Sequence, residues 1–147
     1  MRIHAASLTS TFIAVAVAGL ATACGSDTPT TPSTPATPTV SFSQQIQAPI
    51  FTTTCVACHT DDGRTPSGGL NLKAGTSFGQ LVNIASTGKA GATRVIPGNP
   101  SGSYLVQKLE GAADIVGLRM PRNGPPFLTD AQIATIRQWI QNGAPNN

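Results

Sequence analysis

The sequence contains few of the residues that build large cores and charged surfaces. Only 10% of its 147 residues are charged and only 5% are aromatic, whereas charged residues usually make up about a quarter of a protein. Its nine Lys and Arg residues are scattered, so the net charge of +3 forms no basic stripe for nucleic acid. Three cysteines are too few for a disulfide-dense scaffold. The length allows one folded domain, and that domain is small enough to have only marginal stability from its core alone.

The N-terminal segment is typical of an export signal. Residues 1–23 begin with the positive charge of Arg2 and end in an apolar stretch, 12–23, that is too short to span a bilayer comfortably. The alternative is an uncleaved membrane anchor. The small residues before Cys24 resemble a bacterial lipoprotein cleavage box, although Ala21 stands where that family prefers Leu, and an ordinary signal-peptidase site also fits. We expect Cys24 to be the lipidated first residue of the mature chain, because a lone exported cysteine has no other obvious role.

A Thr/Pro-rich segment separates the export signal from the rest of the chain. Residues 24–39 contain no apolar side chain large enough to pack a core, and their prolines remove amide donors. We expect the lipidated Cys24 and this segment to form a disordered, extended tether to the membrane. The folded domain is then 40–147, in an exported protein that is periplasmic or an outer-membrane or cell-surface lipoprotein.

The chemistry of the domain is carried by Cys-Val-Ala-Cys-His at 55–59. This is the attachment motif of c-type haem. Two thiols three positions apart on one helical turn can reach two vinyl groups on the same porphyrin edge, so Cys55 and Cys58 are expected to form thioethers. The adjacent His59 is expected to ligate the iron from the proximal side. The sequence therefore predicts one covalent haem c as cofactor.

Other uses of these three residues are less consistent with the sequence. A thioredoxin-like redox pair does not require His59, and no βαβ pattern surrounds Cys55 and Cys58. A zinc site requires four ligands, and only three cluster here. A haem-free, tethered binding module with a Cys55–Cys58 disulfide remains a rival reading.

The second axial ligand can be sought by elimination. His4 and Met1 lie in the removed signal, so His59 and Met120 are the only mature residues of their types. Met120 lies in a loop rich in Pro and Gly, whose stiffened backbone can hold a thioether over iron, and we expect it to be the distal ligand. Three lysines remain formally possible but are protonated and well hydrated at neutral pH: Lys73, Lys89 and Lys108.

The span from about 42 to 145 resembles a class I (mitochondrial-type) cytochrome c domain of the small, single-haem kind found in bacterial exported proteins. The matching segments, in order, are 50–51 before the haem motif, 68–72, 96–100, 103–106, 120–121, 128–130 and 139–144. The resemblance implies an all-α fold around one haem, His/Met ligation, and electron transfer with transient redox protein partners. With both axial positions filled, the iron passes electrons and transforms no substrate, so the protein is not expected to be an enzyme. The alternative is a haem-based enzyme accessory or gas-binding sensor domain with a labile sixth ligand.

Capping residues and apolar periodicity agree with an all-α domain. In the last expected helix, Ile133, Ile136 and Ile140 share one face. The family resemblance implies that the first and last helices pack together. Four helices are expected. The first runs from Ser43 towards Cys55 with a kink or break at Pro49, and the second follows the capping-box pattern of Ser77 and Gln80. The third runs from Asn99-Pro100 through Leu109 to a stop at Gly111, and the fourth runs from the Thr129/Gln132 capping box to a stop at Gly143.

Several further residues are expected to support the haem site or the core. The ring N–H of His59 is expected to donate to a backbone carbonyl, with Pro66 as the family-pattern candidate. Tyr104 and Trp139 are expected to pack in the core rather than to bind haem propionates. The pocket-lining candidates are Leu70, Leu72, Ile96, Pro97 and Leu105. Four arginines are expected at the solvated surface, where any one could neutralise a propionate: Arg64, Arg94, Arg119 and Arg122.

Overall fold

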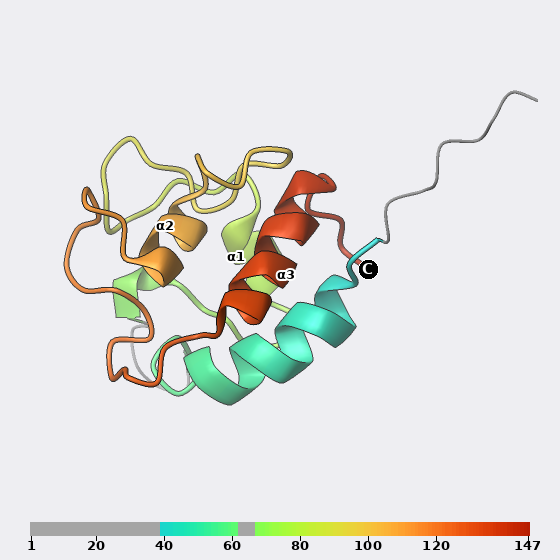
Figure 1. The fold of residues 1–147 in the computed structure, drawn as a ribbon, viewed down its shortest axis with the longest axis horizontal. Helices are drawn as coiled ribbons and strands as arrows, with labels where there is room; N and C mark the ends of the chain where they lie inside the picture. The colour runs from blue at the N-terminus through green and yellow to red at the C-terminus, as the bar shows by residue number, and fades with distance from the viewer. Residues whose placement is uncertain (1–38, 62–66) are drawn as a thin grey trace, which may run out of the picture. The chain divides into compact units, whose positions relative to one another are not determined.

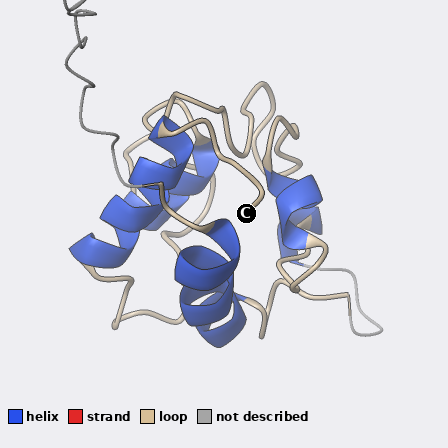
Figure 2. Ribbon diagram, turned by 90° about the vertical axis from the view of Figure 1, so that its right-hand side faces the viewer, coloured by secondary structure: helices blue, strands red, loops and turns tan. Residues whose placement is uncertain are grey.

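The computed structural model describes residues 39–61 and 67–147 (Figure 1). Helices joined by long loops make up this part of the chain, and it contains isolated β-bridges but no strand (Figure 2). The elements are η1 (Phe42–Cys55), η2 (Ser67–Gly69), α1 (Ser77–Leu81), α2 (Tyr104–Glu110) and α3 (Asp130–Gln141). The expected all-α fold is thus confirmed.

The predictions for the N-terminal segment concern residues that are not described. The chain divides into two units, 1–36 and 37–147. The export signal, Cys24 and all but the last residue of the tether lie outside the described residues. Within 39–61 and 67–147, no helix is both long and apolar enough to cross a membrane.

The first helix starts earlier than expected and continues through Pro49 to Cys55. Its cap is Ser41, whose side chain accepts a hydrogen bond from the Gln44 amide, so the prediction of Ser43 as the cap is wrong. Pro49 lies inside η1 and does not interrupt it. η1 has the wide winding of a π-helix, and the wider turn leaves room for a proline ring that would clash with the preceding carbonyls of an α-helix. The carbonyl of Pro49 accepts a hydrogen bond from Thr53 Oγ1 at 2.7 Å.

The core lies where η1 meets α3. The ring centroids of Phe42 and Trp139 are 5.0 Å apart, and Phe51 and Phe78 meet the same Phe42 ring edge-on. Trp139 is fully buried, and its Nε1 donates to the Pro145 carbonyl at 2.8 Å. Figure 1 shows α3 lying next to η1, and the two helices are in contact. The expected packing of the first helix against the last is therefore confirmed.

The last helix begins as the sequence predicts. Thr129 Oγ1 accepts from the Gln132 amide, and Gln132 Oε1 accepts from the Thr129 amide, which completes the capping box. Ile133, Ile136 and Ile140 are all buried.

The two short helices differ from the prediction at their starts. α1 begins after Thr76, which makes no side-chain cap. Ser77 lies inside α1, with its Oγ donating to Gln47 Oε1, so its predicted capping role is wrong. α2 begins at Tyr104 and not after Asn99, because the intervening residues form a turn in which Asn99 Oδ1 accepts from the Gly102 amide. Gly111 ends α2 as expected, in the left-handed conformation with φ 75°.

Candidate functional site

The cysteine–histidine motif folds as a continuation of η1. The amide of Val56 donates to the Phe51 carbonyl at 3.0 Å. The amides of Cys58 and His59 then both donate to the Cys55 carbonyl, at 3.2 and 3.0 Å. A single helical turn therefore carries both thiols and the imidazole, as the spacing predicts.

The two thiols are chemically unlike a redox-active pair. Both are free; Cys55 is half-buried and Cys58 is exposed. Burial, and to a smaller degree the neighbouring Cys58, raise the pKa of Cys55 to about 11. Thioredoxin-like pairs depend on a thiol whose pKa is lowered so that it reacts as a thiolate. The Cys55 thiol is neutral at physiological pH, which disfavours that reading of the motif.

His59 has a buried ring nitrogen, Nδ1, near the backbone of Ser67 and Leu70. Its Nδ1 makes no hydrogen bond of good geometry with the described residues. Burial lowers the pKa of the imidazole, while the nearby backbone groups of Ser67 and Leu70 oppose that effect. These backbone groups occupy the place expected for the carbonyl partner, whereas Pro66 lies outside the described residues.

The chain returns to the motif just after the gap in the described residues. The Ser67 amide donates to the Cys58 carbonyl at 3.3 Å, and the Leu72 amide donates to the His59 carbonyl at 2.8 Å. Gln47 on η1 holds the same segment through a hydrogen bond to the Leu72 carbonyl at 3.0 Å. The segment 67–72 is therefore bonded directly to the turn that carries the thiols and the imidazole.

Arg94 is a buried clamp on this segment, so the expectation that it is solvated is wrong. Only 6% of the residue is exposed. Its guanidinium donates to the Gly69 carbonyl at 2.9 Å and to the Gln80 carbonyl at 2.8 Å, which ties the returning segment to α1. The positive charge of Arg94, with that of Lys108, also acts to lower the pKa of His59. Both cations therefore lie towards the imidazole.

The other three arginines have different surroundings. Arg119 is half-buried, with Nε donating to the Leu109 carbonyl at 2.7 Å and its guanidinium 4.2 Å from the centroid of the Phe127 ring, so its assignment to the solvated surface is also wrong. Arg122 is exposed, as expected. Arg64 lies outside the described residues.

Met120 is half-buried and packs against the core. Its amide donates to the Lys108 carbonyl at 2.8 Å, so the end of α2 sets the position of its backbone. The charge of Lys108 also acts to lower the pKa of His59. Lys108 therefore contacts Met120 and influences the imidazole. Lys108, which sequence reasoning considered only as an alternative ligand, thereby enters the site as a structural residue.

The polar groups of Tyr104 and Trp139 both form hydrogen bonds within the chain. The Tyr104 hydroxyl accepts a hydrogen bond from the Val116 amide at 3.0 Å, and the Trp139 indole donates to a backbone carbonyl. Tyr104 is 6% exposed and Trp139 is fully buried. The expected core packing of both residues is confirmed.

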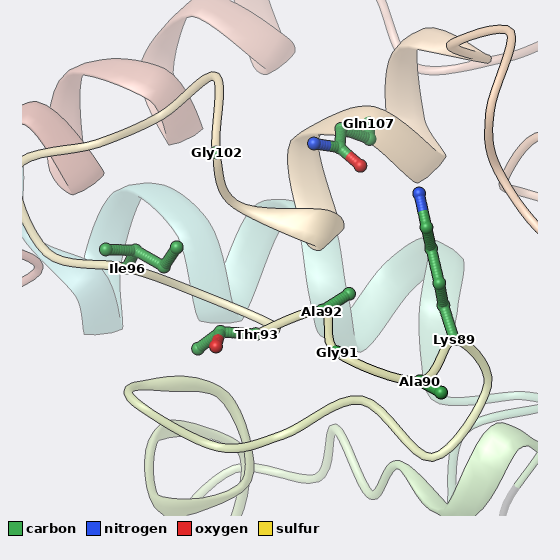
Figure 3. Close-up of a pocket in the computed structure, with 8 residues that line it drawn as sticks. All are labelled: Lys89, Ala90, Gly91, Ala92, Thr93, Ile96, Gly102 and Gln107. Atoms are coloured by element: carbon green, nitrogen blue, oxygen red, sulfur yellow. The ribbon is translucent and has the colours of Figure 1, made fainter.

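Several apolar side chains pack against the core but remain partly exposed. Leu70 and Leu105, two of the pocket-lining candidates, pack against the core yet remain partly exposed, whereas Leu72 is a core residue. Two cavities lie elsewhere: one of about 320 Å³ between residues 89–93 and α2 (Figure 3), which Ile96 also lines, and one of about 410 Å³ between α2 and α3. The side chains that pack against the core and stay partly open are Cys55, Val56, Leu70, Phe78, Val82, Leu105 and Met120.

These features fit a covalent haem. The two thiols are free and lie on one turn. The adjacent imidazole is half-buried, and several partly exposed apolar side chains pack against the core.

Comparison with known proteins agrees with this arrangement. A family model described as Cytochrome c matches residues 48–144, which is well over half of the chain. No curated protein and no solved structure matches it. The chain therefore belongs to the cytochrome c family, whose domains bind a covalent c-type haem and whose typical activity is electron transfer.

Proposed function

We propose that this protein is an exported, single-haem electron carrier in which Cys55 and Cys58 hold the haem through thioethers and His59 and Met120 are its axial ligands. The observation that carries the proposal is the turn at 55–59. It presents a neutral thiol, a second free thiol and a half-buried imidazole, all within five residues. Membership of the cytochrome c family supports the same reading.

The chain's own residues then have distinct tasks. The iron of the haem supplies a one-electron redox couple. Cys55 and Cys58 fix the haem in place, and His59 and Met120 fill both axial positions so that no substrate enters. Leu70 and its partly exposed apolar neighbours exclude water from the site.

Two cations adjust the electrostatics of the proposed site. The charges of Arg94 and Lys108 already act on the imidazole of His59. Positive charge next to a haem favours the reduced iron, which carries one positive charge fewer. Arg94 and Lys108 therefore act to raise the reduction potential.

Export and membrane attachment belong to the same proposal. The signal at 1–23 would deliver the chain to the compartment in which c-type haem is attached. Lipidation of Cys24 and the tether to residue 39 would then hold the domain outside the cytoplasm, at the periplasmic or outer surface. Transient docking of redox proteins suits a carrier that must bind and release its partners quickly.

The haem assignment is tested on the full chain expressed together with a cytochrome c maturation system. Intact mass and a pyridine haemochrome spectrum of the purified protein should show one covalently added haem. Replacing Cys55 and Cys58 by Ala should abolish the covalent addition. A colourless wild-type protein with an unmodified mass would contradict the proposal and favour the disulfide-bonded binding module.

The distal ligand needs a separate test. Ferric haem with a thioether ligand has a weak near-infrared absorption band, which wild type should show and Met120→Ala should lack. Leu118→Ala is the matched control, because Leu118 lies two residues away with a mostly exposed side chain. If wild type lacks the band and binds carbon monoxide readily, the gas-binding alternative with a labile sixth ligand is favoured instead.

Lipidation is tested by metabolic labelling with a fatty acid. Wild type should incorporate the label and sediment with membranes, whereas Cys24→Ser should be unlabelled and soluble after export. An unlabelled wild type would show that processing follows the ordinary signal-peptidase route.

A further inference from the structure

The loop that leads from α2 to Met120 has an unusual surface. Two of its large apolar side chains are mostly exposed, Val116 at 57% and Leu118 at 60%. Such side chains contribute little burial to hold the loop in place. Its order must therefore come from contacts of its backbone.

Lys108 supplies those backbone contacts. Its Nζ donates to the Val116 carbonyl at 2.9 Å and also to the Leu118 carbonyl. Its own carbonyl accepts the Met120 amide at 2.8 Å. One residue in the last turn of α2 thus binds the loop at three backbone positions, the last of which is Met120 itself.

Neighbouring side chains support the same loop without touching Met120. The Tyr104 hydroxyl accepts from the Val116 amide at 3.0 Å. Arg119 Nε donates to the Leu109 carbonyl at 2.7 Å. Lys89 Nζ donates to the Asp114 carboxylate at 2.6 Å. Among the described residues, Lys108 is the one whose side chain and backbone both bind this loop.

We propose that Lys108 is a positioning residue for Met120: its ammonium holds the Val116 and Leu118 carbonyls and its carbonyl holds the Met120 amide, so that the thioether is presented to the haem iron by a preassembled loop. The inference rests on the proposed ligation by Met120. An ammonium has three donors and no acceptor, and two of those donors are used on carbonyls two residues apart in the loop. Without them the two carbonyls lose their charged partner, and the loop is held only by its remaining hydrogen bonds.

The first experiment measures how easily the distal ligand is displaced from ferric holoprotein by added imidazole. Lys108→Leu keeps an apolar stem but removes the donors, and should bind imidazole about tenfold more tightly than wild type, because the loop before Met120 loses two hydrogen bonds to a charged group. Its near-infrared band should weaken at the same time. Lys108→Arg keeps charged donors and should recover most of the wild-type behaviour.

The matched control is Lys73→Leu. It removes the same charge from a lysine whose ammonium lies 3.8 Å from the Asp61 carboxylate. Its imidazole affinity should equal that of wild type. If Lys108→Leu and Lys73→Leu bind imidazole equally, the effect is one of net charge and the inference is wrong.

A second measurement needs no variant at Lys108. In wild-type holoprotein, the backbone amides of Met120 and Val116 should be protected from hydrogen exchange to the same degree as amides of α2. Tyr104→Phe removes the acceptor for the Val116 amide, and should speed exchange there while Met120 stays protected. Rapid exchange of both amides in wild type would overturn the inference.

The two proposals fail in different ways. A wild type without the near-infrared band overturns Met120 ligation itself. A wild type that has the band, together with a Lys108→Leu variant that keeps wild-type imidazole affinity, overturns only the role of Lys108.

Discussion

Replacement of Arg94 by Leu should destabilise the domain more than any other single change at an arginine. The guanidinium is 6% exposed and donates to the Gly69 and Gln80 carbonyls at 2.9 and 2.8 Å. Leu keeps the apolar stem of the side chain but leaves both carbonyls without their donor. Because these carbonyls are only partly buried, each loss should cost about 1–2 kcal/mol, which is the lower part of the range for unsatisfied groups.

The total loss is therefore about 2–4 kcal/mol, a large share of the 5–15 kcal/mol that typically stabilises a domain. For a domain of this size it corresponds to a fall in Tm of about 10–20 °C. Thermal unfolding of the holoprotein, followed by far-UV circular dichroism, measures it directly. The Tm of Arg94→Lys should lie between those of wild type and Arg94→Leu, because one ammonium cannot present the forked donors that reach both carbonyls.

Arg122→Leu is the control, since Arg122 is exposed and a change there should alter the free energy of unfolding by no more than about 0.5 kcal/mol. If Arg94→Leu melts within about 2 °C of Arg122→Leu, the two hydrogen bonds do not act as the clamp described above, and the reasoning from unsatisfied carbonyls is refuted.

Three further changes test other parts of the structure. Thr129→Ala removes the cap of α3 and should lower the free energy of unfolding by about 1 kcal/mol in chemical denaturation. Gly111→Ala should cost about 1 kcal/mol or more, because this residue has φ 75° and an added Cβ would approach a neighbouring side chain to 3.0 Å, whereas Gly79→Ala meets nothing within 4 Å and should be neutral or slightly stabilising. The hydrogen bond and charge of Lys89 hold the pKa of Asp114 below its ordinary 3.8. The stabilising effect of the Asp114 carboxylate is therefore present above pH 3.8 and is lost as the pH falls through the lowered value. The Tm difference between wild type and Asp114→Asn should then shrink to zero in acid.

The parts of the fold that depend on local sequence could be predicted. The capping box at Thr129 and the left-handed stop at Gly111 involve residues within one turn, and both occur as expected. The turn that carries Cys55, Cys58 and His59 is equally local, so their clustering follows from spacing alone.

The start of η1 could not be predicted because it depends on the other end of the chain. Ser41 and Ser43 are both suitable caps from sequence. The C-terminal residue decides between them: Asn147 accepts the Phe42 amide through Oδ1 and the Ser43 amide through its carbonyl, both at 2.8 Å. Residues more than 100 positions apart set this boundary, and no local pattern contains that information.

The capping pattern before α1 failed for a related reason. Ser77 and Gln80 have the right spacing, but tertiary contacts take both side chains. Ser77 Oγ donates to Gln47, and Gln80 Oε1 accepts from Arg94 at 3.3 Å. The burial of Arg94 was not predicted either, because the carbonyls that accept its hydrogen bonds belong to segments that come together only in the folded chain.

The distribution of burial explains where the haem contributes to stability. The packing of η1 against α3 is already complete, since Phe42 and Trp139 are buried among chain atoms. By contrast, apolar side chains such as Leu70, Leu105 and Met120 contact the core but remain partly exposed. Covering such surface is worth about 25 cal/mol per Å², so the haem should add stability wherever it covers these side chains.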